Sequence, residues 1–332
     1  MADDISTGLD GGTGDIIHLD PHELSTHSAN IEIYQNRDLP EEFLRSIDEY
    51  GILEPVVVTE SQTIISGHRR VKAARQLAID NIPCRVASYE SRSEEVLALI
   101  DYNRQREKTA GEKLREAQRY MSAQRHRSLE NQQEGGRLGG KTSANNDSGK
   151  GSSNLTNAST DIRAEAAEKT GVSSGTISKG MTVLDAAEGT EKVGERVQKV
   201  AQQEMHQLDD DEQSVHGAEQ NVRAAKSLNE FLRSSDEIES DVAQSKFNAV
   251  LDGKKSARDA LKEAEREINR RKQKRDIDEG ETPTPPEGKF DVIVADPPWP
   301  YDDNTWKSEH RGTVPYPTMS IDELMEIDVP AA

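Results

Sequence analysis

The chain has 332 residues, of which 33% are hydrophobic, 31% charged and 4% aromatic, a balance typical of several small modules joined by solvated linkers rather than one large core. Its formal net charge of −20 excludes the uniformly basic surface of many nucleic-acid-binding proteins, and favours a salt-adapted, halophile-like acidic protein with local basic patches. One cysteine, an acidic start and no long apolar run exclude a disulfide framework, a signal peptide and a membrane span, so we expect a cytoplasmic protein.

The first ordered module is predicted over residues 16–125, after a Gly-rich acidic stretch, 1–15, that predicts disorder. Pro40, followed by two acids and by apolar residues at helical spacing, predicts a helix that ends at Gly51. Strands are predicted at 55–58 and 63–66, then a helix from 68 to 78, a strand at 82–86 and a helix from Ser93. This alternation predicts a small α/β domain.

A candidate anion site lies where the helix at residue 68 begins, in the sequence Gly67-His68-Arg69-Arg70. The glycine allows close approach, the first helical amides point outward, and guanidinium groups bind phosphate well. The alternative interpretation is a pair of ordinary surface arginines.

Several segments of this module are similar, in the same order, to the N-terminal domain of the ParB family. They are 34–37 (YQNR), 41–58 (EEFLRSIDEYGILEPVVV), 66–70 (SGHRR) and 99–106 (LIDYNRQR). The resemblance implies a pocket that binds CTP with magnesium and acts as a clamp switch. By position, its residues would be Gly67, Arg69 and Arg70 at the phosphates, with Arg37, Asn103 and Arg106 completing the pocket.

Two departures from the ParB pattern bear on that pocket. His68 stands where the family has an acid, and Asp101 stands for the usual glutamate before Asn103, which argues against magnesium binding, a metal site and CTP turnover. The related sulfiredoxins carry a cysteine in their corresponding box. Here Cys84 falls on a predicted strand, where it is expected to be a small core residue without a redox role.

Basic residues recur over 104–127 at a spacing that predicts one face of a helix, which would either contact a phosphate backbone or lie in solvent. Residues 126–160, rich in Gly, Ser and Asn, predict a flexible linker. Within it, residues 135–142 match the P-loop pattern. A P-loop needs a strand before it and a helix after it, so we expect no nucleotide site there.

A helix-turn-helix is predicted over residues 161–187. Asp161 would cap the first helix, and a glycine turn at 171–174 separates it from the second. The second helix would present short donors and a lysine to a groove of double-stranded DNA: Ser173, Ser174, Thr176, Ser178 and Lys179. The alternative is an ordinary helical hairpin. A homodimer is a further expectation.

Residues 188–278 predict a charged helical spacer. Its acidic runs, 209–212 and 237–241, are expected to lie in solvent. A narrow apolar stripe from Ala257 to Ile268 ends in basic residues 270–275 and predicts a helix that pairs with a partner helix or separates the two ends of the protein. A proline-rich linker, 279–288, follows.

A buried parallel strand is predicted at 290–295, and Asp296 follows it at the carboxyl end, where open α/β sheets bind ligands. Pro297 and Pro298 lack backbone donors and leave carbonyl oxygens exposed, and Trp299 adds a flat ring. Together they suit a planar substrate with an exocyclic amino group.

The sequence Asp296-Pro297-Pro298-Trp299, with 316–324 (YPTMSIDEL) and 327–330 (IDVP), resembles the family of mRNA adenosine methyltransferases and their prokaryotic DNA-adenine relatives. The resemblance implies S-adenosylmethionine as methyl donor. Asp296 would polarise the adenine amine, a carbonyl of the proline pair would accept its other hydrogen, and Trp299 would hold the base. The family's fold needs further strands after this motif, so residues 289–332 would form an incomplete domain with an incomplete cofactor pocket. We expect residues 1–332 alone not to methylate.

The sequence thus predicts a multidomain α/β plus α protein: a ParB-like α/β domain, a helix-turn-helix, a helical spacer and an incomplete Rossmann-like methyltransferase domain. The first hypothesis is a DNA-binding adenine-N6 methyltransferase targeted by its upstream modules. The alternative is a non-enzymatic, CTP-responsive ParB-type DNA-binding protein for partition or transcriptional regulation. A nuclease ranks last, because the sequence offers no paired carboxylates or histidine metal cluster. RNA as the methylation substrate stays open.

Overall fold

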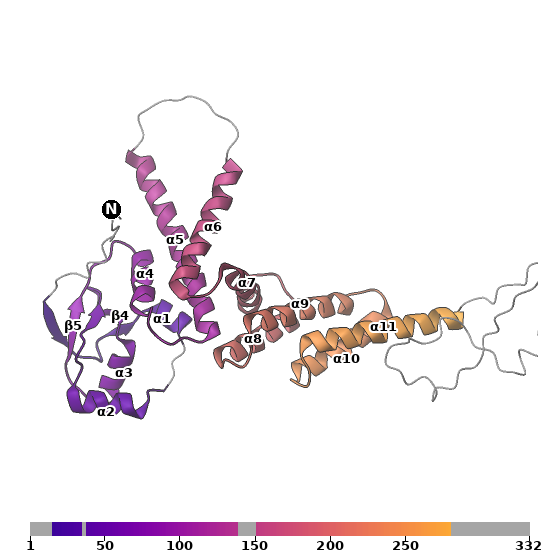
Figure 1. Cartoon of the computed structure of the whole chain (residues 1–332), viewed down its shortest axis with the longest axis horizontal. Coiled ribbons are helices and arrows are strands. Elements are labelled where there is room, and N and C mark those ends of the chain that lie inside the picture. Colours follow the sequence, from indigo (N-terminus) through magenta and orange to yellow (C-terminus); the bar gives the residue numbers. More distant parts are fainter. Residues whose placement is uncertain (1–14, 35–37, 139–150, 280–332) are drawn as a thin grey trace, which may run out of the picture. The chain divides into compact units, whose positions relative to one another are not determined.

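The computed structural model describes residues 15–34, 38–138 and 151–279, which fall into two compact units (Figure 1). The first unit runs to Lys192 and includes 201–219, and the second contains 193–200 and the chain from Gln220 onward. Four sets of predictions lie outside the described residues. They are the disordered stretch up to residue 14, Arg37, the part of the predicted linker at 139–150, and everything from residue 280, including Asp296, Pro297, Pro298 and Trp299.

The first unit is built on a five-stranded mixed sheet with the order β1-β5-β3-β4-β2. Its strands are β1 (Ile16–Leu19), β2 (Ser25–Thr26), β3 (Val56–Val58), β4 (Thr63–Ser66) and β5 (Ile82–Val86). The central strand β3 runs parallel to β5 and antiparallel to β4. The edge strand β1 pairs antiparallel with β5, and β2 pairs parallel with β4. The predicted α/β domain is therefore confirmed.

Four helices accompany the sheet: α1 (Ser28–Ile33), α2 (Glu41–Tyr50), α3 (His68–Gln76) and α4 (Arg92–Tyr102). Helix α2 follows Pro40 and ends at Gly51, whose φ of 72° is accessible to glycine at little cost. Helix α4 begins one position earlier than predicted, because Ser91 is its N-cap and accepts a hydrogen bond from the Glu94 amide at 3.3 Å. Helix α1 and strand β2 were not predicted.

The sheet separates two hydrophobic clusters, because successive strand residues point to opposite faces. Val56, Val58 and Ile64 pack with Val71 and Ala74 of α3 in one cluster. Cys84 belongs to that cluster and is fully buried, and burial raises the pKa of its thiol to about 11. The prediction that this cysteine is a core residue is confirmed.

The other cluster joins the α/β domain to three helices: α5 (Ala110–Leu138), α6 (Gly151–Thr170) and α7 (Ser174–Glu188). Tyr34 of the α1 C-cap and Leu99 of α4 share this core with Ala166 of α6 and Ile177 of α7. Helix α5 packs on α1, α4, α6 and α7, and Figure 1 shows it alongside α6 at the end nearest the sheet. The helix-turn-helix and the sheet domain therefore form one packed body.

The linker predicted over 126–160 differs from the structure, because α5 continues to Leu138 and α6 begins at Gly151. Residues 124–134 are rich in Gln, Glu and Arg, which favour a helix even without burial. The P-loop look-alike at 135–142 begins inside α5, which ends at Leu138, whereas a P-loop begins after a strand.

Four helices occupy the region predicted as a charged helical spacer: α8 (Glu195–Asp209), α9 (Val215–Leu232), α10 (Glu237–Leu251) and α11 (Ala257–Glu279). Phe247 of α10 is fully buried, and the stripe of Ala257, Ala264 and Ile268 on α11 packs into the same core. The basic end of α11 pairs with the acidic start of α10, where Lys272 lies 2.5 Å from Glu239 and Arg271 lies 2.7 Å from Asp241. The apolar stripe of α11 therefore packs against α10 of the same chain. Across the described residues, none of the helices combines the length and apolar content that a membrane span requires.

Candidate functional site

The predicted anion site is centred on Gly67, the N-cap of α3. Its φ of 98° lies in the left-handed region, and an added Cβ would lie 3.0 Å from Val56 Cγ2. Glycine is required here by both backbone conformation and close approach. Because it has no side chain to cap the helix, the first-turn N–H groups of α3 are left to other acceptors, including an anion.

The two arginines beside Gly67 differ in what they contact. Arg70 donates to the carbonyl oxygens of Glu54 and Pro55, the latter at 3.0 Å, and lies 2.9 Å from the Glu54 carboxylate. It therefore fastens the start of α3 to the segment before β3. Arg69 is exposed, and its guanidinium stacks 4.7 Å from the Phe43 ring centroid. Arg69 is thus the arginine whose charge remains available to a ligand.

The segment after α4 supplies the other predicted pocket residues. Arg106 lies 4.6 Å from the Tyr34 ring centroid and 3.3 Å from the Glu112 carboxylate. It also lies close enough to His68 to lower the pKa of that imidazole. Asn103 is the C-cap of α4, and its side-chain amide donates to the Leu99 carbonyl at 2.8 Å. The fold therefore brings Arg106 to the start of α3, whereas Asn103 mainly holds the end of α4.

A buried polar network underlies Arg106. Lys108 Nζ lies 2.6 Å and 2.7 Å from the two oxygens of Glu116, and the Tyr34 hydroxyl donates to Glu116 at 2.6 Å. The Lys108 and Glu116 side chains are 3% and 0% exposed. Burial raises the pKa of Glu116 and, together with the carboxylate, the pKa of Tyr34. The network fixes the segment that carries Arg106.

Sequence reasoning missed this network, although one signal was present. Thr109 and Glu112 form a capping box at the start of α5: Thr109 Oγ1 accepts from the Glu112 amide, and Glu112 accepts from the Thr109 amide, each at 3.2 Å. The Thr-x-x-Glu spacing marks a helix start inside what was predicted as one basic helical face.

His68, which replaces the family's acid, is a neutral and largely buried imidazole. Its Nε2 has no hydrogen-bond partner among the described residues. Burial, followed by the charges of His27 and Arg106, lowers its pKa to about 3. Burial likewise lowers the pKa of His27, even though the Glu95 carboxylate lies 3.3 Å from its Nε2.

These histidines predict that the first unit loses stability as the pH falls from 7 to 5. The folded pKa of His68 lies below the unfolded value near 6.5, so the unfolded chain takes up more protons as the pH falls and is stabilised relative to the folded state. The expected slope is at most about 1.4 kcal/mol per pH unit for one such histidine. Urea unfolding at pH 7, 6 and 5 checks it, and His68→Gln should flatten the slope. An unchanged slope in that variant would contradict the assignment.

The side chains at the two departures from the ParB pattern do not fit a magnesium ion. His68 offers a neutral nitrogen, whereas magnesium prefers carboxylate and other oxygen ligands. The Asp101 carboxylate accepts from Lys169 Nζ at 2.7 Å, so it is committed to a cation of α6. Among the described residues, no cluster of three or more His, Cys, Asp or Glu side chains could hold a metal.

The surface predicted to contact base edges in a groove of double-stranded DNA, the reading surface, lies at the start of α7. Gly171 has a φ of 69° in the turn after α6, and Ser173 caps α7 by accepting from the Thr176 amide at 3.1 Å. Ser174, Ser178 and Lys179 are exposed, while Ile177 on the opposite side is buried. The helix thus presents a polar face of the predicted composition. Thr176 is half-buried and bonds to Ser173 Oγ at 2.8 Å.

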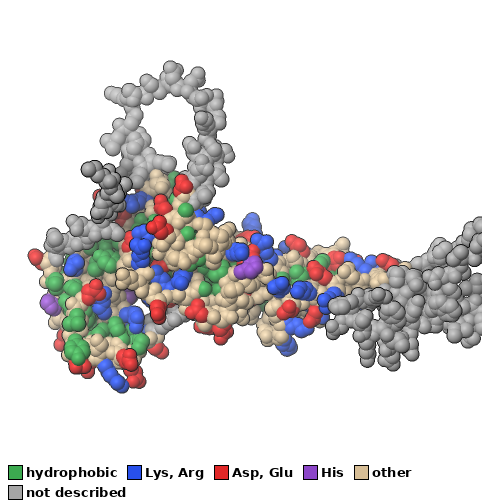
Figure 2. Space-filling view, in the orientation of Figure 1, with side chains coloured by type: hydrophobic (Ala, Val, Ile, Leu, Met, Phe, Trp, Pro, Cys, Tyr) green, Lys and Arg blue, Asp and Glu red, His purple; other side chains and the backbone are tan. Residues whose placement is uncertain are grey.

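The predicted basic face over 104–127 is largely neutralised in the structure, because five of its eight cations pair with carboxylates: Arg106, Lys108, Arg115, Arg119 and Arg127. The acidic run at 209–212 is not simply solvated. Arg115 makes a two-pronged contact with Asp209, and the Ala110 amide at the start of α5 donates to Asp211 at 3.3 Å. Figure 2 shows cationic and acidic side chains interspersed over the visible face.

The fold defines a class of protein. In this class an α/β domain, which has arginines at the start of one helix, shares a hydrophobic core with a helix-turn-helix. The sequence model of the ParB N-terminal domain matches residues 8–102. The Escherichia coli protein YnaK, named a ParB-like nuclease domain-containing protein, is 33% identical over 73 residues, which cover 22% of this chain and 83% of YnaK. This chain belongs to the ParB N-terminal domain family, and the predicted ParB resemblance is confirmed.

Other relatives are longer than the region they share with this chain. The probable chromosome-partitioning protein ParB of Vibrio cholerae is 39% identical over 94 residues, which span 26% of this chain and 32% of that protein. Structures of the C-terminally truncated ParB from Caulobacter crescentus, complexed to the centromeric parS site and with CTP-gamma-S, cover 75% and 70% of this chain. Each alignment covers 98% of the Caulobacter chain, with identities of 16% and 17% and TM-scores of 0.32 and 0.24.

Proposed function

We propose that this chain is a ParB-type protein that binds double-stranded DNA through α7 and binds CTP at the start of α3. The proposal rests mainly on the shared hydrophobic core, in which Tyr34 and Leu99 pack in the same cluster as Ala166 and Ile177. Tyr34 also lies under Arg106 at the nucleotide site. A ligand that moves Arg106 would therefore act on the core that supports the reading helix.

The residues present suit a nucleotide phosphate. Gly67 leaves the first amides of α3 uncapped, Arg69 contributes an exposed guanidinium, and Arg106 lies near the helix start. These side chains would bind and orient CTP without carboxylates placed to hold magnesium, so we propose binding without turnover.

The α7 face suits duplex DNA, because short hydroxyl side chains and a lysine can contact base edges and phosphates in the major groove. Partition or transcriptional regulation is the corresponding biological role, and a homodimer is the corresponding assembly.

Binding measurements with duplex DNA test the first half of this proposal. The full chain is used to select duplexes from a random pool, and Ser174→Ala and Lys179→Ala are then measured by fluorescence anisotropy. We expect Ser174→Ala to lose about 1–3 kcal/mol of discrimination and Lys179→Ala to weaken all duplexes equally. Failure of the wild-type chain to bind any duplex would refute the DNA half.

For CTP, calorimetry should show binding that falls at least tenfold in Arg69→Ala, because a charge-assisted hydrogen bond contributes about 1.5–3 kcal/mol. Arg45→Ala is the matched control, since Arg45 is exposed on α2 and pairs with Glu41 within its own helix. No heat with wild-type protein would refute the nucleotide half and leave the DNA half standing.

A second candidate function rests on sequence alone. Asp296-Pro297-Pro298-Trp299, after its apolar run, favours adenine-N6 methyl transfer from S-adenosylmethionine, delivered to DNA by the upstream modules. The test is methylation of duplex DNA by residues 1–332 and by Asp296→Ala. Methylation that is lost in the variant would support this function, and no methylation by the wild-type residues would count against it.

A further inference from the structure

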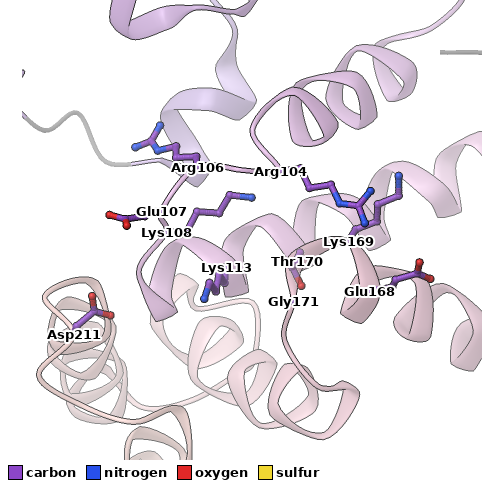
Figure 3. A pocket seen from close by; sticks show the side chains of 10 residues that line it. All are labelled: Arg104, Arg106, Glu107, Lys108, Lys113, Glu168, Lys169, Thr170, Gly171 and Asp211. Atoms are coloured by element: carbon purple, nitrogen blue, oxygen red, sulfur yellow. The ribbon is translucent and has the colours of Figure 1, made fainter. Parts of the chain in front are cut away.

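A cavity of about 570 Å³ lies between the α4–α5 segment, the start of α5 and the α6–α7 turn. Five cationic side chains line it against three carboxylates: Arg104, Arg106, Lys108, Lys113 and Lys169 face Glu107, Glu168 and Asp211. Figure 3 shows Arg104 beside Lys169 on one side of this cavity, with Asp211 on the other. In a chain with a formal charge of −20, such an excess of cations at one cavity is unusual.

The cations of this cavity differ in how far they are already committed. Arg106 and Lys108 belong to the buried network with Glu112 and Glu116. Lys169 is 32% exposed and bound to Asp101. The side chains of Arg104 and Lys113, by contrast, have no hydrogen-bond or ion-pair partner among the residues that the structure describes. Arg104 is exposed and Lys113 half-buried. These two charges are therefore available to an anion from outside the chain.

The cavity continues toward the reading helix. An adjoining cavity of about 370 Å³ shares Lys108, Lys113 and Asp211 with it and reaches Ser173 and Thr176 at the start of α7. The two adjoining cavities form a groove that begins at α7 and is lined in part by cations without partners among the described residues. Such a groove has the form expected of a binding path, or track, for the sugar–phosphate backbone. Phosphate contacts of this kind position the protein on the duplex without reading sequence.

We propose that Arg104 and Lys113 bind backbone phosphates of the duplex whose major groove α7 reads, with Lys169 at the far end of the same track. The inference rests on the proposed DNA-binding function and extends its interface from α7 to the start of α5. Asp211 is the acidic side chain that lines both cavities, and it lowers the positive charge along the track. It therefore limits the strength of backbone binding.

The test is the salt dependence of binding to a 30-base-pair duplex of arbitrary sequence, measured by anisotropy with the full chain from 50 to 300 mM salt. Each phosphate contact contributes about 0.9 to the slope of log affinity against log salt. We expect Arg104→Ala/Lys113→Ala to flatten the slope by about 2 and to weaken binding roughly tenfold. The control Arg45→Ala/Lys254→Ala removes the same charge from exposed sites in α2 and after α10, and should leave the slope unchanged.

Two further arms separate the possible sources of phosphate. CTP affinity of the Arg104→Ala/Lys113→Ala variant should stay within twofold of wild type, and Asp211→Asn should tighten duplex binding severalfold. Asparagine tolerates the φ of 56° at this position and can still accept from the Ala110 amide. If CTP affinity falls while the salt slope is unchanged, the cavity serves the nucleotide and the inference is overturned. If the wild-type chain binds no duplex, the proposed DNA-binding function is refuted, and this inference is refuted with it.

Discussion

Glu116→Ala is expected to lower the free energy of unfolding of the first unit by about 3–5 kcal/mol, the range for breaking a buried ion pair from one side. The substitution leaves the ammonium of Lys108, 3% exposed, without its carboxylate and removes the acceptor of the Tyr34 hydroxyl. A buried charge without a partner is far more costly than a lost surface contact. Urea unfolding, followed by hydrogen exchange of α4 and α5, measures the loss in this unit.

Two comparisons make that result specific. Arg119→Ala breaks a pair with Glu32 whose side chains are 38% and 45% exposed, and should cost less than about 1 kcal/mol. Lys108→Met/Glu116→Leu replaces both charges with apolar groups and should recover most of the lost stability. A loss below 1 kcal/mol in Glu116→Ala would show that the pair is solvated.

Gly180→Val is expected to destabilise the first unit by about 1–3 kcal/mol and to abolish DNA binding. A Cβ at Gly180 would lie 2.2 Å from Leu114 Cδ2 and 2.9 Å from its Cγ, and Leu114 is fully buried on α5. The added side chain must therefore displace Leu114 or push α7 away from α5. Thermal unfolding and duplex anisotropy measure the two effects.

Gly175→Ala is the matched control on the same helix. Its Cβ would meet only Ser173 Oγ, at 3.9 Å, so it should be neutral or stabilising by up to about 1 kcal/mol. Equal damage from both substitutions would mean that α7 tolerates no change at all, and that close packing at Gly180 is not the cause.

Local signals predicted much of the first unit correctly. Pro40 and Gly51 mark the ends of α2, the β-branched run at Val56 marks β3, and Gly171 marks the turn before α7. Each depends on the conformational preference of the residue itself. The polar face of α7 was likewise readable from the spacing of its serines.

The sequence did not show which charged residues form ion pairs with residues far away in the chain. Lys108 and Arg115 belonged to an apparently uniform basic face, yet one is buried on Glu116 and the other binds Asp209, 94 positions away. The same applies to the acidic start of α10, which pairs with α11. Charge patterns record which residues a helix carries, whereas the partner of each charge depends on the tertiary fold. Arg70, predicted to face phosphates, shows the same limit because its guanidinium binds backbone carbonyls.

The core that joins Tyr34 and Leu99 to Ala166 and Ile177 has a consequence for how the protein opens. Amides of β4, α4 and α7 should become accessible to deuterium together, in one cooperative event, because none of these elements can leave without exposing the apolar surface of the others. A fragment that ends before α6 would leave part of this core uncovered and would be prone to aggregate. We therefore expect the sheet domain and the helix-turn-helix to fold as a single unit, despite the many residues that separate them in sequence.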